Sequence, residues 1–173
     1  SKEGKGIRFG QEDIRDMGRT AAGVRGIRLS DGDIVVGMDV IEEGDETSDI
    51  LVVMENGLGK MTSVSEYRSQ NRGGSGVKTA NVTKKTGKVV SARVIRKDEK
   101  GDLIITAKSG QAIRLPLTQI PSQGRATQGV ILMRLPEGDS VCTVSLIPPL
   151  EEEILEIPEA EIPNENVVSM FEE

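Results

Sequence analysis

Short apolar stretches alternate with turn-forming residues along most of this chain. In the middle of the chain, four such stretches cover residues 50–54, 58–62, 76–82 and 88–95. Residues 76–82 alternate in the way expected of a strand with one face toward a core and the other toward solvent. Gly, Asn and Asp lie between the stretches, for example in residues 55–57 and 98–101, and they favour tight turns. The pattern predicts four short strands.

The same pattern recurs every 53 residues. Three landmarks keep this spacing: an early glycine, an arginine, and a later glycine that valine follows. In three successive units these landmarks are Gly4, Gly57 and Gly110; Arg19, Arg72 and Arg125; and Gly23, Gly76 and Gly129. The spacing predicts an array of about three repeats. Four strands per repeat are typical of propeller-like blades.

The repeat spacing also predicts the boundaries of the body. We expect an all-β body in residues 1–150, with blades at approximately residues 1–49, 50–102 and 103–150. The counterpart of strand 50–54 is missing before Ser1, so the first repeat is expected to begin late and to leave strand edges unpaired. Residues 151–173 combine Pro and Glu without the strand pattern, which predicts a disordered tail.

Composition excludes several classes of function. The 173 residues include no His, no Trp and only three other aromatic side chains, so the core must be built from Val, Ile and Leu. Without His the usual Ser or Cys triads are excluded, and we expect no catalytic residue, metal site or cofactor. No apolar stretch is long enough to cross a membrane, and the polar residues 1–5 are not expected to act as a signal peptide. The single Cys142 fits a reducing cytoplasm and is expected to be a small core residue.

The net charge of −6 averages two different segments. Nine of the 28 acidic residues and none of the 22 basic ones lie in residues 151–173, so residues 1–150 hold 19 acids against 22 bases, a balance of +3. A mildly basic body therefore carries an acidic tail. Such a division indicates a body that meets polyanions and a tail that competes with them. A tail that is merely solvated remains the alternative.

A basic motif recurs where a loop meets the next strand. Its three copies are residues 19–23, 72–76 and 125–129, in which small residues surround an arginine. Such a surface lets a phosphate backbone approach closely, and glycine allows a tight entry into the strand. The candidate phosphate-binding residues are Arg8, Arg19, Arg25, Arg28, Lys60, Arg68, Gln70, Arg72, Lys78, Arg114, Gln123, Arg125 and Arg134.

The recurring arginine also has a structural interpretation. It could stabilise the repeat by pairing with a neighbouring carboxylate, and the two roles are compatible. Residues 67–78 favour binding, because they hold three basic residues and no acid. Contacts with phosphates add up along a curved edge, and they carry little sequence preference. Their placement defines the bend of the duplex.

Residues 17–27 and 66–76 together resemble the C-terminal domain of the bacterial DNA gyrase A family. The resemblance implies a β-pinwheel, a propeller-like disc in which adjacent blades exchange strands and duplex DNA wraps around a basic rim. It also implies partners, namely the rest of the gyrase A polypeptide and the gyrase B polypeptide in an A2B2 holoenzyme of the bacterial cytoplasm. That ATP-dependent type IIA topoisomerase would introduce negative supercoils, while this chain would be non-catalytic.

Two departures from the family pattern concern the binding role. The family's box is a Gln, two Arg, two Gly, a Lys and a Gly, whereas this chain has Asn71 and Ser75 at two of the basic positions. Family domains have about six blades, so the chain corresponds to the C-terminal half and the tail. Tyr67 lies on a wrapping blade and is not the strand-breaking nucleophile.

Three alternatives remain open from the sequence. One is the equivalent domain of topoisomerase IV. Another is a propeller-like protein-interaction module whose basic loops are only structural. The third is a piece that does not bind DNA without further blades. For residues 151–173 we predict electrostatic inhibition of binding through occupation of the basic rim.

Overall fold

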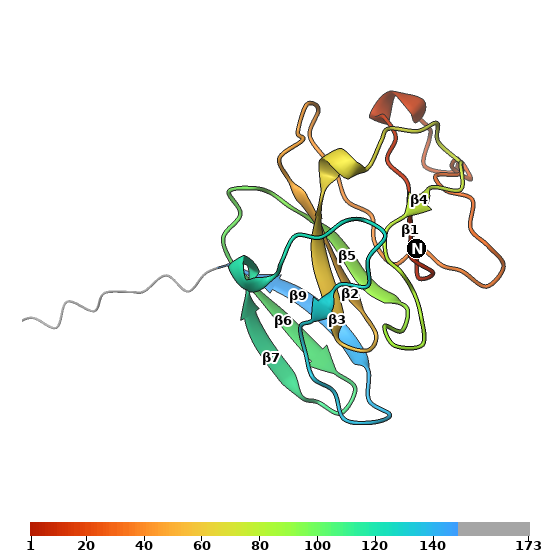
Figure 1. The fold of residues 1–173 in the computed structure, drawn as a ribbon. Helices are drawn as coiled ribbons and strands as arrows, with labels where there is room; N and C mark the ends of the chain where they lie inside the picture. The colour runs from red at the N-terminus through yellow and green to blue at the C-terminus, as the bar shows by residue number, and fades with distance from the viewer. Residues whose placement is uncertain (149–173) are drawn as a thin grey trace, which may run out of the picture.

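The computed structural model describes residues 1–148, in which strands predominate (Figure 1). The strands are β1 (Lys5–Gly6), β2 (Asp49–Met54), β3 (Leu58–Ser63), β4 (Val77–Lys78), β5 (Val89–Ile95), β6 (Asp102–Ala107), β7 (Ala112–Pro116), β8 (Val130–Ile131) and β9 (Val141–Ile147). Three 3-10 turns lie 53 residues apart, namely η1 (Gln11–Asp13), η2 (Val64–Glu66) and η3 (Leu117–Gln119). The predicted all-β class is confirmed. The predicted disordered tail, residues 151–173, lies outside the described residues.

Three of the four strands predicted in the middle repeat are confirmed as β2, β3 and β5. The fourth prediction, residues 76–82, was too long, because only β4 forms there. After Lys78 the backbone divides its hydrogen bonds between two repeats. The Thr79 amide donates to the Gly4 carbonyl at 2.8 Å, whereas the Asn81 amide donates to the Thr127 carbonyl at 3.0 Å. No single ladder can therefore continue.

Neighbouring repeats exchange strands. The sheets have the strand orders β1-β4, β5-β2-β3-β8 and β7-β6-β9, and Figure 1 shows them following one another across the molecule. Strand β8 belongs to the third repeat but completes the sheet of the second, and β4 of the second repeat joins β1 of the first. Both junctions have one register, since Lys5 opposes Lys78 and, 53 residues later, Leu58 opposes Ile131.

Strand β2 is buried on both faces, which explains its unbroken apolar sequence. Leu51 and Val53 pack into a cluster between the second and third sheets, together with residues such as Leu103 of β6. Val52 and Met54 point the other way, into a smaller cluster with Leu58, Ala80 and Val89. Covering both faces removes the need for polar positions, so such a strand shows no alternation.

The first repeat is incomplete within the described residues. Residues 35–41 correspond to β9, and within one residue to β5, but form no strand, and Val35, Met38 and Val40 are exposed. No described strand lies where β2 would pair with this segment. A strand without a ladder partner loses the hydrogen bonds that hold it extended, which accounts for the missing strand.

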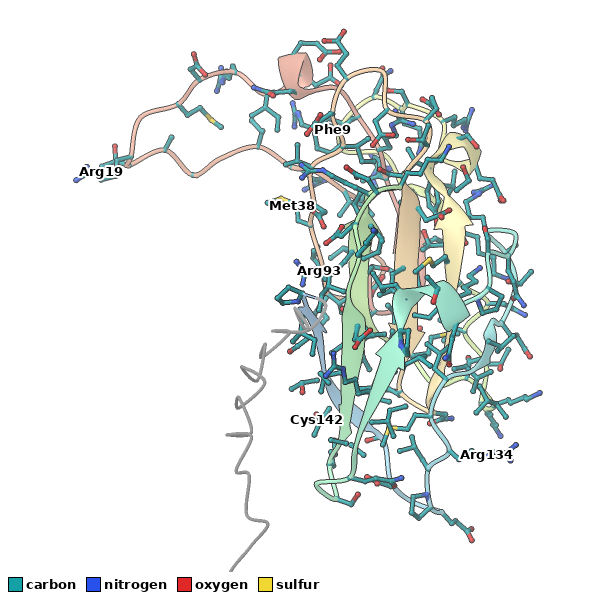
Figure 2. The ribbon with its side chains drawn as sticks, turned by 90° about the vertical axis from the view of Figure 1, so that its left-hand side faces the viewer. Phe9, Arg19, Met38, Arg93, Arg134 and Cys142 are labelled. Atoms are coloured by element: carbon teal, nitrogen blue, oxygen red, sulfur yellow. The ribbon has the colours of Figure 1, made fainter. Side chains whose placement is uncertain are left out.

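The prediction that Cys142 is a core residue was wrong. Cys142 is exposed on β9 (Figure 2), which is an edge strand of the third sheet. Val141 on the opposite face of β9 is buried instead. A short apolar sequence does not reveal which of two alternating faces meets the core. Within residues 1–148 the structure holds no helix with the length and hydropathy of a membrane span.

Candidate nucleic-acid interface

Each 3-10 turn leads into one of the basic loops. We call residues 14–23, 67–76 and 120–129 the Arg loops. The second Arg loop docks on the first repeat through the Gln70 amide, which donates to the Arg8 carbonyl at 2.8 Å. The third docks on the second repeat in the same way, from the Gln123 amide to the Met61 carbonyl at 2.8 Å. Arg8 and Met61 are 53 residues apart, so equivalent residues of the preceding repeats hold consecutive Arg loops in one register.

Glycine closes each Arg loop, as predicted. Gly23, Gly76 and Gly129 have φ angles of +82°, +69° and +80°, which L side chains rarely adopt. Gly76 and Gly129 must be glycine for a second reason, because the backbone of the preceding repeat lies too close to leave room for a side chain. A Cβ at Gly76 would lie 2.4 Å from the Gly6 carbonyl oxygen, and one at Gly129 would lie 2.5 Å from that of Gly59.

The three repeated arginines have three different environments. Arg19 is exposed at the tip of a loop that projects from the body (Figure 2). Arg72 is half-buried, and it donates from Nε to the Asp13 carbonyl at 3.1 Å and from Nη1 to the Arg25 carbonyl at 2.7 Å. Among the described residues none of the three forms an ion pair with a carboxylate. Arg72 thus stabilises the junction through carbonyls, unlike the carboxylate pairing considered from the sequence.

Arg125 lies against the preceding repeat. Its guanidinium lies over the Tyr67 ring, 5.9 Å from the ring centroid, within the range of a cation–π interaction. Its backbone amide donates to Oε2 of Glu66 at 2.8 Å. Burial raises the pKa of Tyr67, so its phenol stays neutral near pH 7. Within the described residues, Nε of Arg125 is buried without a hydrogen-bond partner.

The other predicted cations divide into those paired with a carboxylate and those without an ion pair among residues 1–148. Arg8 donates to the carbonyls of Val64 and Tyr67 and pairs with Glu46 at 3.1 Å, and Arg114 pairs with Asp102. These two cations are already matched by carboxylates and offer less charge to a polyanion. The exposed cations of the predicted set outside the Arg motif are Arg25, Arg28, Arg68, Lys78 and Arg134. Figure 2 places Arg134 at the opposite end of the molecule from Arg19.

The two predicted glutamines differ as well. Oε1 of Gln123 accepts a hydrogen bond from the Thr127 hydroxyl at 3.1 Å, inside the third Arg loop. Nε2 of Gln70 is buried and, among the described residues, has no partner. A buried donor without an acceptor is costly.

Lys60 is the predicted residue whose position differs most from the expectation. Its side chain is fully buried, at 0% exposure. Nζ donates to the carbonyls of Gly124 at 2.7 Å and Arg125 at 2.6 Å, and to the Thr127 hydroxyl at 3.2 Å. Burial lowers the pKa of Lys60 to about 8, while Glu66 acts to raise it and Arg125 to lower it. Lys60 therefore contacts the third Arg loop from the interior of the protein and is not available to bind DNA.

Sequence reasoning missed Lys5. Strand exchange places Lys5 of β1 directly opposite Lys78 of β4, and both side chains are exposed. Like charges directly opposite each other destabilise a pair of strands unless an anion lies between them. At the next junction the same positions hold Leu58 and Ile131. The 53-residue spacing aligns Lys5 with Leu58, but only the pairing of β1 with β4 brings it beside Lys78.

Comparison with known proteins gives consistent matches. The family described as "DNA gyrase C-terminal domain, beta-propeller" matches residues 1–42, 48–96 and 101–148. The DNA gyrase A polypeptide of Staphylococcus epidermidis is 48% identical over 141 residues, covering 82% of this chain and 16% of the relative. The corresponding Staphylococcus aureus protein is 46% identical over the same length. The chain thus spans about 16% of the length of these curated relatives.

Two solved structures have the same fold. One, described as "Structure of DNA gyrase A C-terminal domain", gives a TM-score of 0.70 at 30% identity and covers 84% of this chain and 48% of that one. The other, described as "Crystal structure of the C-terminal domain of DNA topoisomerase IV", gives a TM-score of 0.76 at 19% identity and covers 85% and 45%. The second shows a shared fold alone.

Proposed function

Because the chain belongs to the DNA gyrase C-terminal domain family, we propose that it binds duplex DNA through phosphates and bends it along its basic edge. The chain matches only the C-terminal, non-catalytic domain of the gyrase A polypeptide. One observation carries the proposal: consecutive Arg loops dock on their neighbours in one 53-residue register. Repeated basic loops at a fixed spacing suit a polymer of regularly spaced phosphates.

In the whole protein, the bend would support negative supercoiling by the type IIA topoisomerase. The partners would be the rest of the gyrase A polypeptide and the gyrase B polypeptide in an A2B2 assembly, in the bacterial cytoplasm at the nucleoid. The identities of 46–48% to gyrase A polypeptides favour gyrase over topoisomerase IV, whose matching structure is 19% identical. A protein-interaction module is the second class of function, and salt dependence separates it from DNA binding.

Binding of the chain to long duplex DNA should weaken steeply with added salt. With about four phosphate contacts, counterion release predicts a loss of affinity on the order of 100-fold between 50 and 200 mM salt. Fluorescence anisotropy with a labelled duplex of random sequence measures the slope. A packed apolar interface would show little salt dependence, and an absence of binding at 50 mM salt would contradict the proposal for this chain.

Removal of residues 151–173 should strengthen DNA binding at low salt. The nine carboxylates of this segment would compete with phosphates for the basic body, whose balance is +3. We expect an affinity gain of roughly 3- to 10-fold at 50 mM salt that shrinks as screening increases. The matched control keeps the segment but replaces its nine Glu by Gln, and it should behave like the deletion. Equal affinity of all three chains would show that the tail does not compete.

A further inference from the structure

Lys60 connects two repeats at the base of an Arg loop. It stands on β3 of the second repeat, and its ammonium donates to the Gly124 and Arg125 carbonyls and to the Thr127 hydroxyl of the third. All three N–H donors of the ammonium thus have acceptors in one loop. Within the described residues Lys60 forms no ion pair with a carboxylate.

Three consecutive carbonyls of this loop face β3. Two residues along the strand from Lys60, the Thr62 hydroxyl donates to the Gln123 carbonyl at 2.8 Å. Lys60 binds the next two carbonyls, those of Gly124 and Arg125. A carbonyl oxygen carries partial negative charge and repels phosphate. Turning three of them toward the protein leaves the outer surface of the loop more favourable to a polyanion.

Stability alone does not explain a buried lysine at this position. The corresponding residues of the first and third repeats are Ile7 and Ile113. Taking an ammonium out of water is expensive, and an apolar side chain of similar volume is often as stable or more so. Lys60 donates to the Arg125 carbonyl at 2.6 Å, and the Glu66 carboxylate accepts from the Arg125 amide at 2.8 Å, so two cationic residues share one carboxylate neighbour. Two cations beside one carboxylate leave net positive charge, which favours the approach of an anion.

We propose that Lys60 is a positioning residue, which holds the third Arg loop with its carbonyls inward so that Arg125 meets a DNA phosphate. The proposal rests on the DNA binding proposed above. Lys60 itself, at 0% exposure, does not touch DNA. The Glu66 carboxylate binds the backbone amide of Arg125, and the Tyr67 ring lies against its guanidinium.

The test uses the whole chain with Lys60→Met, and with Lys100→Met as a control that removes an equal charge from an exposed turn. Without DNA, hydrogen exchange of the amides in residues 123–129 should become at least about 10-fold faster in K60M and stay unchanged in K100M. Circular dichroism verifies the fold. If K60M does not fold, Thr62→Val loosens the same loop with Lys60 in place and should give a smaller change in the same direction.

The DNA affinities of the Lys60 and Arg125 variants then test whether Lys60 acts through Arg125. K60M should lose about as much affinity as Arg125→Ala, on the order of 3- to 10-fold at 100 mM salt, and the double variant should lose no more than R125A alone. Independent losses that multiply would overturn the positioning role, as would a loosened loop with unchanged affinity. If the unmodified chain itself fails to bind, the proposed function fails and this role falls with it.

Discussion

Simultaneous replacement of Arg19, Arg72 and Arg125 by alanine is expected to weaken binding to long duplex DNA by on the order of 500-fold at 100 mM salt. Each phosphate contact contributes roughly an 8-fold factor at this salt through counterion release. The slope of log affinity against log salt should fall by up to about 2.7, because three contacts are lost. A salt titration of both chains measures the two quantities.

A matched control removes the same charge outside the Arg loops. Arg93, Lys97 and Lys100 are exposed in β5 and the segment after it, and their triple alanine variant should keep most of the affinity and the slope. Equal losses in the two triple variants would mean that net charge, and not the Arg loops, drives binding. In that case the repeated motif would have no special role in DNA contact.

The single variants separate binding from folding. Arg72→Ala should also lower the free energy of unfolding by about 1–2 kcal/mol, because the Asp13 and Arg25 carbonyls lose their donor. Arg19→Ala should leave it unchanged, since Arg19 is exposed at a loop tip. Any affinity lost in R19A is then a direct effect on DNA contact.

Gly57→Ala is expected to lower the free energy of unfolding by about 3 kcal/mol or more, while Gly110→Ala costs only about 1–2 kcal/mol. Both glycines end hairpin turns at equivalent positions, with φ angles of +77° and +89°. A Cβ at Gly57 would lie 2.2 Å from the Met133 carbonyl oxygen, whereas nothing lies within 4 Å of one at Gly110. Urea unfolding of both variants measures the difference.

The difference in unfolding free energy between Gly57→Ala and Gly110→Ala measures the contact between repeats, because the backbone strain is common to both variants. Both alanines would have an unfavourable positive φ, but only the one at position 57 would also clash with the segment just after β8, at Met133. The Leu132 and Met133 amides both donate to the Gly57 carbonyl, at 2.8 and 3.0 Å, so the two segments cannot easily separate. Equal destabilisation of the two variants would show that this junction opens freely in solution.

The repeat spacing predicted much of the fold because turns and hairpins are local. Gly4, Gly57 and Gly110 all have positive φ angles, and the strands predicted at residues 50–54 and 58–62 form one hairpin, as the alternation of apolar runs and turn residues indicates. The repeat spacing did not predict that β4 and β8 join the sheets of the preceding repeats. Spacing shows which segments are equivalent, but not which sheet each one joins, and only the family resemblance implied exchange.

The candidate site was predicted less well than the fold. Arg19, Arg72 and Arg125 are equivalent in sequence, yet their environments differ because the preceding repeats offer different partners, such as the Arg25 carbonyl or the Tyr67 ring. Lys60 is a charged residue between Gly59 and Met61 of β3, and it was expected to be exposed. Its burial depends on the Gly124 carbonyl, 64 residues further along, which no local pattern reveals.

Strand exchange also affects synthesis on the ribosome. Strand β8, which completes the second sheet, begins 67 residues after β3 ends. A ribosome adding about 5–20 residues per second needs roughly 3 to 13 s for that stretch. Meanwhile the edge of β3 exposes backbone donors and acceptors to any extended chain nearby. The rate of translation thus sets how long each nascent sheet is open to aggregation.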